Sequence, residues 1–222
     1  MHLNVQQLYC KSKYFKNNLY LSIIIAKYHY MSSLIELFKS ITLITAETEE
    51  KLSEIISTCE ISKNDFFLRE GQTPRTIGFV KSGLFRYYYS NKDGVEFTKG
   101  FIAENNILSS YSALIENRES YFYIQALENS VIEQINYQLF NKNFSNTLWF
   151  KDIVILLLQK AYCFKEERER QFLLFDAEER YVSFFNRYPG LDKRIKQHII
   201  ASFLGITPES LSRIRKKMGL LT

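Results

Sequence analysis

The sequence lacks a long hydrophobic run. Its 222 residues are 46% hydrophobic, which is enough to bury a substantial core in one or two domains. No stretch of about 18 consecutive apolar residues occurs, although a membrane-spanning helix needs one of that length. We therefore predict no transmembrane helix and expect no membrane partner.

Cysteine is scarce as well. The three cysteines, Cys10, Cys59 and Cys163, are odd in number and far apart along the chain. This spacing excludes a disulfide framework, a zinc-finger ligand set and an iron–sulfur ligand set. We expect no metal and no cofactor, and we predict that the protein resides in a reducing cytoplasm.

Catalytic motifs are also missing. The chain contains no G-x-S-x-G nucleophile turn, no phosphate-binding P-loop, no G-x-G-x-x-G and no H-E-x-x-H. Two of the three histidines, His2 and His29, lie near the N-terminus, and the third is His198. We therefore predict that the protein is not an enzyme.

The first thirty residues are basic, with four lysines and no acidic residue, and they include the apolar stretch "LYLSIIIA" at 19–26. A basic start followed by a short apolar run is typical of a secretory signal, but no cleavage site with small residues follows. We interpret residues 1–30 as a poorly integrated extension, with Met31 as the candidate natural start.

The middle third of the chain predicts a β-structure. From about residue 61 to 135, short segments rich in aromatic and β-branched residues alternate with turn signals such as Gly83 and Asp93–Gly94. We expect "FVKSGLFRYYYS" (79–90) and "VEFTKGFI" (95–102) to form two strands around a tight turn. Further strands are expected at 67–70, 105–110, 121–128 and 130–137. Many short strands at this spacing indicate a barrel or a jelly-roll-like sandwich.

A long helix is expected next, over residues 147–172. Apolar residues recur in it at steps of four and three, namely Phe150, Val154, Leu157, Ala161 and Phe164. This a/d pattern is typical of a helix that packs lengthwise against a partner. The five side chains are candidates for a dimer seam, and a seam within the same chain is the alternative. A further helix is predicted over 176–188, capped by Asp176 and ended by Pro189–Gly190.

The stretch "HIIASFLGITPESLSRIRKKMG" (198–219) reads as two apolar-periodic helices joined at Gly205. Thr207 is placed to cap the second helix, and Pro208 fits its first position, where a missing N–H costs nothing. Leu211 and Ile214 fall on one side of this helix, predicted over 208–218, and would pack back onto the first helix.

The opposite side of the second helix carries only polar groups, among them Glu209, Ser212 and Arg213. Residues 193–222 hold seven Lys or Arg and one acid, a charge of +6, while the whole chain is +5. The other 192 residues therefore sum to −1, so the positive charge is concentrated around this helix. A polar helix face in a basic region predicts a helix-turn-helix that binds DNA. Thr207, Lys216, Lys217 and His198 are candidates for phosphate contacts.

A roll, a long helix and a helix-turn-helix in that order resemble the Crp/Fnr superfamily of bacterial transcription regulators, particularly the divergent members found in Bacteroidetes. The resemblance covers residues 31 to 220, and its most specific parts are "DAEERYVSFFNRYPGL" and "IIASFLGITPESLSRIRKK". It implies an α+β protein with a double-stranded β-helix (jelly-roll-like) effector domain at 31–146 and a dimerisation helix at 147–172. A winged helix-turn-helix-type domain is implied at 173–222.

The resemblance also implies a homodimer that binds an inverted-repeat operator in double-stranded DNA, with RNA polymerase as a further partner. Glu209, Ser212 and Arg213 match the base-contacting positions of the Fnr-like branch, which favours a half-site similar to TTGA. Members of the Crp branch have an arginine just before the glutamate, where this chain has Pro208, so any contact made by that arginine should be absent.

The effector site departs from the family pattern. Members that bind cyclic AMP carry Gly-Glu and, several residues later, an arginine, and the matching positions here are Ser109–Ser110 and Glu119–Ser120. We therefore expect that cyclic AMP is not the effector, whose identity the sequence leaves open. The candidate effector-pocket residues are Ser109, Ser110, Tyr111, Ser120 and Tyr121. The alternative function is a sensor module that binds a cyclic nucleotide or another small ligand without functional DNA readout.

Overall fold

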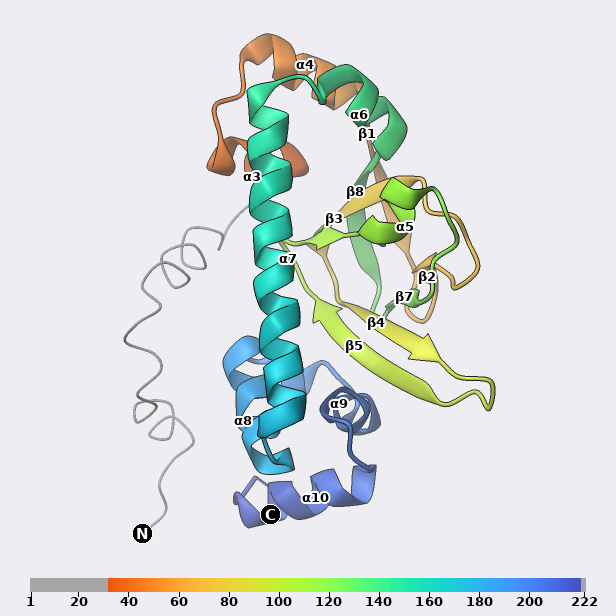
Figure 1. The fold of residues 1–222 in the computed structure, drawn as a ribbon, viewed down its shortest axis with the longest axis vertical. Helices are drawn as coiled ribbons and strands as arrows, with labels where there is room; N and C mark the ends of the chain where they lie inside the picture. Colours follow the sequence, from red (N-terminus) through yellow and green to blue (C-terminus); the bar gives the residue numbers. More distant parts are fainter. Residues whose placement is uncertain (1–31, 221–222) are drawn as a thin grey trace.

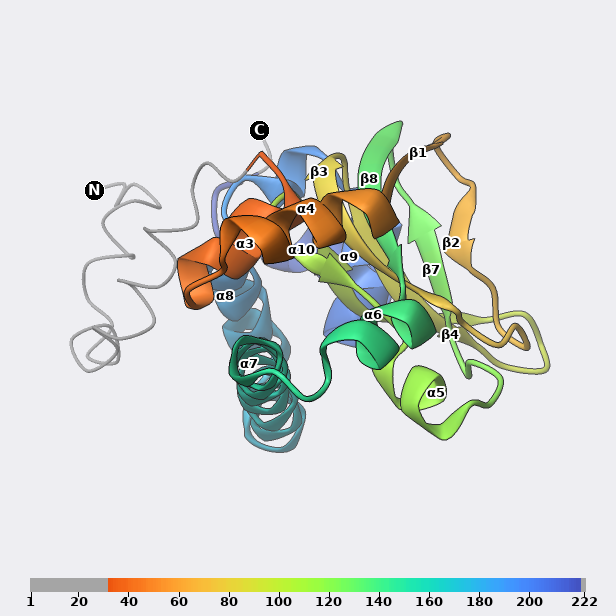
Figure 2. The same cartoon turned by 90° about the horizontal axis from the view of Figure 1, so that it is seen from above.

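The structure, a computed structural model, describes residues 32–220. The predicted extension 1–30 and the candidate start Met31 lie outside the described residues. The described chain forms two helices, a β-roll with a short inserted helix, a long helix and a C-terminal group of helices (Figure 1). Figure 2 looks almost along the long helix and shows the roll on one side of it.

The roll consists of two four-stranded antiparallel sheets, with strand orders β1-β8-β3-β6 and β2-β7-β4-β5. The strands are β1 Ile56–Ile61, β2 Phe66–Leu68, β3 Thr76–Ser82, β4 Phe85–Ser90, β5 Glu96–Ile102, β6 Ile107–Leu108, β7 Tyr123–Ala126 and β8 Ser130–Asn136. Apolar side chains of both sheets meet in the interior of the roll, as in a sandwich. The predicted jelly-roll-like fold is confirmed.

The hairpin around Asp93–Gly94 is confirmed as β4 and β5. The single strand predicted over 79–90 is wrong, because the chain leaves one sheet and enters the other after Ser82. Gly83 makes this change of sheet with a φ of 112°. A Cβ on Gly83 would lie 2.0 Å from the hydroxyl oxygen of Ser130, so only glycine fits.

Two parts of the roll were not predicted correctly. Strand β1 was missed, although it pairs with β8 along its whole length, from Ile56 opposite Ile135 to Ile61 opposite Ser130. The strand predicted at 105–110 is limited to Ile107–Leu108, because the chain turns into α5 (Tyr111–Glu116).

Helices cover the end of the roll opposite the C-terminal helices (Figure 1). They are α3 Leu34–Ile41, α4 Ala46–Ile55 and α6 Tyr137–Phe144. An aromatic cluster joins them to the long helix: the Phe38 and Phe140 rings stack with centroids 5.6 Å apart, and Trp149 lies 5.0 Å from Phe144. This cluster anchors the first turns of the long helix on the roll.

The long helix α7 runs from Leu148 to Leu174 over 27 residues, with Thr147 as its N-cap. Part of the predicted dimer seam packs within the chain, which is the alternative that the sequence left open. Phe150 is only 7% exposed, and Val154 and Leu157 pack against the same aromatic cluster. Phe164 lies over β5, with a ring carbon 3.6 Å from where a Cβ of Gly100 would stand. Ala161 is the exposed member of the five.

The C-terminal helices pack on each other and on the roll. They are α8 Ala177–Arg187, the short 3-10 helix η2 Leu191–Lys193, α9 Gln197–Leu204 and α10 Pro208–Lys217. The predicted cap of α8 is confirmed, since Asp176 and Glu179 form a reciprocal capping box. Within residues 32–220 no strand follows α10, so the wing expected beside these helices is not found there.

The roll and the C-terminal helices share one hydrophobic core. Phe101 of β5 lies among the rings of Phe184, Tyr188 and Phe203, with centroids 6.2, 5.4 and 5.3 Å away. Leu84 from the β3–β4 turn belongs to the same cluster. Burial of these rings fixes the helices against the lower end of the roll.

Candidate nucleic-acid interface

Helices α9 and α10 form the hairpin that the sequence predicted. Gly205 adopts a left-handed φ of 69° after α9, and the N–H of Ile206 donates to the carbonyl of Ala201 at 3.1 Å. The chain can therefore reverse within three residues. Leu211 and Ile214 of α10 are 1% and 8% exposed, because they pack into the core that α9 helps to form.

The N-terminal turn of α10 is well capped. The Thr207 hydroxyl accepts a hydrogen bond from the N–H of Ser210 at 3.2 Å, and Pro208 occupies the first turn. Hydrogen bonds from its own backbone N–H and from the Thr207 side chain, together with nearby Arg213, lower the pKa of Glu209 below its usual value. Glu209 is therefore a carboxylate at neutral pH and can only accept hydrogen bonds.

The three predicted base-contacting side chains lie together on the exposed side of α10. Glu209, Ser212 and Arg213 are all exposed, as is Lys216 one turn further on. In the part of the chain that the structure describes, Ser212, Arg213 and Lys216 make no side-chain hydrogen bond or ion pair. We call these four residues the readout face. The Ser212, Arg213 and Lys216 side chains are free for a partner, while Glu209 also accepts hydrogen bonds from its own N–H and from Thr207.

The predicted phosphate contacts differ in how free they are. Thr207 and His198 are exposed at the ends of α10 and α9. Lys217 is engaged, with its ammonium 2.6 Å from Glu178 of α8, although its side chain remains 70% exposed. Arg194 is also engaged within the chain. The seven cations counted in the sequence therefore overstate the positive charge that is free for a partner.

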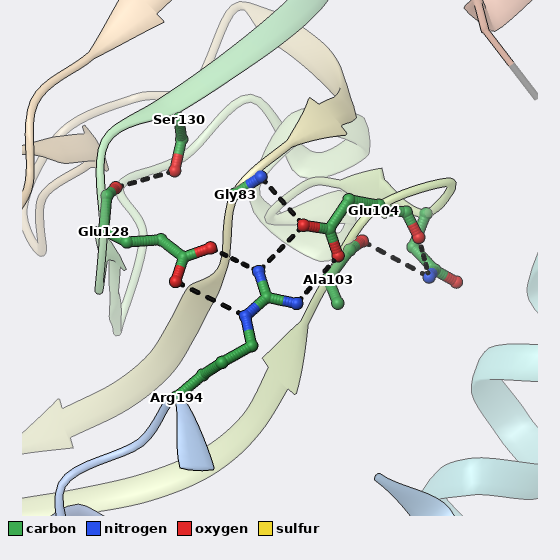
Figure 3. Close-up of polar contacts among 7 residues, drawn as sticks. Gly83, Ala103, Glu104, Glu128, Ser130 and Arg194 are labelled. Carbon is green, nitrogen blue, oxygen red and sulfur yellow. Dashed lines mark hydrogen bonds and ion pairs between the residues drawn. The ribbon is translucent and has the colours of Figure 1, made fainter. Parts of the chain in front are cut away.

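Arg194 holds the C-terminal helices to the roll by two carboxylates (Figure 3). Its guanidinium donates to Glu104, after β5, at 2.8 and 3.1 Å, and to Glu128, after β7, at 3.4 Å and by a second, shorter bond. We call these three residues the latch. The sequence contains no local signal for it, because Arg194 lies 90 and 66 residues from its partners.

The latch also involves the turn that separates the two sheets. Glu104 accepts a further hydrogen bond from the N–H of Gly83 at 3.0 Å (Figure 3). Partial burial acts to raise the pKa of Glu104, but the bonds from Arg194 and the backbone outweigh it and leave the pKa below its usual value. The latch is therefore an ion cluster at neutral pH.

A second polar contact joins α9 to the edge of the roll. The Ser202 hydroxyl accepts from the N–H of Thr98 at 2.9 Å and donates to the carbonyl of Glu96 at 2.8 Å. Strand β5 is the last strand of its sheet, so α9 satisfies and covers part of an open edge. Arg168 and Arg180 donate to the last carbonyls of α9, at Phe203 and Leu204.

Three of the predicted effector residues come together inside the roll. The Ser110 and Ser120 hydroxyls lie 3.1 Å apart and both residues are 1% exposed. The Ser120 hydroxyl also bonds to the carbonyl of Phe122 at 2.9 Å, and the N–H of Ser109 donates to the Tyr87 hydroxyl at 3.0 Å. The buried Ser109 hydroxyl has no hydrogen-bond partner among the described residues. All of these groups are neutral, so none of them offers an anion a positive charge.

The other two predicted effector residues lie elsewhere. Tyr121 is 63% exposed, with the Arg118 guanidinium carbon 4.1 Å from its ring centroid, and Tyr111 meets the ring of Tyr137. Arg118 pairs with Glu116 at the surface. Cyclic-AMP-binding members carry an arginine near this position. Because Arg118 is paired with Glu116 at the surface, it does not bring a free positive charge to Ser110 and Ser120.

No helix among residues 32–220 is long and apolar enough to cross a membrane. Within the same residues, no three His, Cys, Asp or Glu side chains gather as a metal site.

Comparison with known families identifies part of the roll. Residues 58–147, less than half of the chain, match the family model of the cyclic nucleotide-binding domain. No curated protein matches the sequence significantly.

Several solved structures share this fold over most of the chain. A CooA mutant from Carboxydothermus hydrogenoformans is 21% identical with a TM-score of 0.65, covering 87% of this chain and 88% of that chain. FixK2 from Bradyrhizobium japonicum is 14% identical with a TM-score of 0.66, covering 74% and 85%. A protein from Eubacterium rectale, assigned to the crp/fnr family of transcriptional regulators, is 15% identical with a TM-score of 0.64, covering 80% and 84%. At these identities the likeness shows a shared fold.

Proposed function

We propose that this chain, which has the fold of the Crp/Fnr superfamily and its cyclic nucleotide-binding domain, is a sequence-specific DNA-binding transcription regulator. The observation that carries the proposal is the readout face of α10. Its apolar side is buried against α9, while its polar side is exposed. The Ser212, Arg213 and Lys216 side chains on that side make no hydrogen bond or ion pair within the described chain. A helix in this state can enter the major groove of DNA with three of its four readout side chains unpaired.

Each residue of the readout face has a distinct role in this proposal. Arg213 makes a bidentate contact to O6 and N7 of guanine, and Glu209 accepts from the N4 amine of cytosine. Ser212 is short enough to touch a thymine or adenine edge. A half-site similar to TTGA contains the bases that these contacts require.

Phosphate contacts set the register of the helix without reading sequence. Lys216 is the strongest candidate, because it is exposed and unpaired in residues 32–220. Thr207 and His198 flank the readout face at helix ends. Lys217 contributes less than Lys216, because DNA must first compete with Glu178 for it.

A second copy of the chain supplies the dimer partner through the outer side of α7. Leu148, Ile155 and Tyr162 recur every seven residues there and are 79%, 53% and 68% exposed, with Leu158 beside them at 43%. Heptad spacing of exposed apolar residues is the signature of a helix that packs against a parallel partner. This seam replaces the one predicted around Phe150 and Leu157.

We further propose that cyclic AMP is not the effector. The neutral Ser110–Ser120 pair stands where a cyclic phosphate would need a cation, and Arg118 is committed to Glu116. Contacts with RNA polymerase and a cytoplasmic location complete the proposed role of a bacterial regulator.

Titration of a fluorescent random-sequence duplex with the full chain tests DNA binding itself. We expect binding at low salt, with the logarithm of the binding constant falling linearly against the logarithm of salt concentration. The slope should become shallower by about one unit in Lys216→Ala but stay unchanged in Lys63→Ala, an exposed lysine on the roll. Absence of binding at low salt would favour the sensor module without DNA readout.

A further inference from the structure

A hollow of about 470 Å³ lies between the start of β3, the end of α5 and the start of α6. Thr73, Arg75, Leu114, Asn117, Tyr137 and Gln138 are among the residues that line it. A second hollow of about 460 Å³ shares residues 73–75 with the first and is also lined by Phe67 and Gln72. Arg75 lines both hollows.

We propose that the larger hollow binds a small organic carboxylate. Arg75 holds the carboxylate group in this assignment, and Leu114 and Tyr137 contact the apolar body of the ligand. The hollow and its cation carry this proposal independently of DNA binding.

Among residues 32–220, Arg75 is the only cation that lines the hollow. Among the residues that the structure describes, its side chain makes no ion pair, hydrogen bond or ring contact. Its backbone is fixed, because its carbonyl accepts from the N–H of Tyr137 at 2.9 Å. Arg86, Arg118 and Arg194 all pair with carboxylates. A planar guanidinium held on a fixed backbone matches a carboxylate with two parallel bonds.

Neutral polar groups surround Arg75 at the rim. The side chains of Thr73, Asn117 and Gln138 make no hydrogen bond within residues 32–220 and are exposed. Asn117 is held in the left-handed region with a φ of 48° at the end of α5. Asn136 uses its side-chain oxygen to cap α6, at 3.0 Å from the N–H of Leu139, which leaves its amide donors for the hollow.

Apolar groups form the other part of the lining. Leu114 is 8% exposed, Pro74 is buried, and the Tyr137 ring is fixed by a contact with the Tyr111 ring at 6.4 Å. The lining is more polar than apolar, and its one cation and convergent neutral groups can fix the orientation of a ligand, as polar groups do in small-molecule sites. The combination favours a carboxylate with an apolar body over a bare inorganic anion.

This hollow lies at the end of α5 away from the two buried serines. Ser110 precedes the first residue of α5, while Leu114 and Asn117 lie at its C-terminal end. A ligand that contacts both Arg75 and Leu114 would therefore influence the position of α5. Through α5 it would influence the Ser110–Ser120 hydrogen bond. Regulation of DNA binding by this ligand rests on the proposed function, but binding of the ligand does not.

Isothermal titration of the full chain with benzoate, acetate and inorganic phosphate tests the proposal. We expect one saturable benzoate site per chain, weaker binding of acetate, and the weakest binding of phosphate. Arg75→Gln should weaken benzoate binding about tenfold or more, because it removes a charge-assisted contact. Lys142→Gln, an exposed cation on α6 outside the lining, should bind benzoate as the parent chain does.

Three results would overturn the assignment: no saturable benzoate binding, equal binding in Arg75→Gln, or tighter binding of phosphate than of benzoate. A parallel titration of duplex DNA keeps the two proposals apart. If the chain binds benzoate but no DNA, the proposed function is wrong and the carboxylate site is supported. If the chain binds DNA but no benzoate, the carboxylate site is wrong and the proposed function is supported.

Discussion

Replacing Arg194 by alanine should loosen the C-terminal helices from the roll. The change removes four hydrogen bonds to Glu104 and Glu128 and leaves two carboxylates without a counter-charge. The Arg194 side chain is 30% exposed and both carboxylates are 34% exposed, so water compensates part of the loss. We expect a loss of about 2–3 kcal/mol in the free energy of unfolding, typical of hydrogen bonds to charged groups.

Calorimetric melting at neutral pH measures this loss. For a chain of this size, each kcal/mol corresponds to a shift in Tm of about 2–4 °C, so Arg194→Ala should melt about 4–12 °C lower. Lys193→Ala, which alters an exposed neighbour, should melt like the parent chain. A double-mutant cycle with Glu104→Gln should show that the two losses are not additive, because both break the same bonds.

Acid should remove the contribution of the latch. The folded pKa of Glu104 is lowered, so the stability that it contributes is present above the unfolded pKa of about 4.3 and is lost as the pH falls through the folded value. The difference in Tm between the parent chain and Glu104→Gln should therefore shrink below about pH 4. If Arg194→Ala has the same Tm as the parent chain at neutral pH, the reasoning is refuted, because the latch then contributes nothing to the free energy of unfolding.

Three further outcomes are expected. Ile155→Asp should yield a folded monomer in sedimentation, because the residue is 53% exposed in the single chain and would be buried in the seam; a dimer would place the seam elsewhere. Gly83→Ala should lower the free energy of unfolding by about 2–4 kcal/mol in denaturant titrations, because its φ of 112° is strained for alanine and the added carbon meets Ser130; an unchanged midpoint would contradict this. Titration calorimetry with cyclic AMP should show no binding at micromolar concentrations, whereas a micromolar Kd would overturn the interpretation of the Ser110–Ser120 pair.

The features that could be predicted from the sequence are local. The hairpin of α9 and α10 follows from the cap at Thr207, the left-handed turn at Gly205 and the apolar spacing of Leu211 and Ile214, all within one short segment. The β4–β5 turn follows in the same way from Asp93–Gly94. Short-range patterns specify such elements before any distant contact forms.

The features that could not be predicted depend on distant contacts. Both sides of α7 carry apolar residues at regular spacing, so periodicity alone could not decide whether Phe150 or Ile155 faces the roll. Packing of the Phe38 and Phe140 rings decides it, and Phe38 comes from α3, far from α7 in the sequence. The role of Arg194 was missed for the same reason, because an exposed arginine and a bridging arginine look alike in a sequence.

Selection of bound sequences from random duplex DNA, with the parent chain and with Arg213→Ala, tests the central claim most directly. The parent chain should enrich an inverted repeat with half-site centres about 10 bp apart, since two copies of α10 would enter successive major grooves. Arg213→Ala should lose about 1–3 kcal/mol of affinity for that sequence and relax the choice of base at the guanine. Failure to enrich any sequence, or an equal loss of affinity for selected and random DNA in Arg213→Ala, would contradict the account of the readout face.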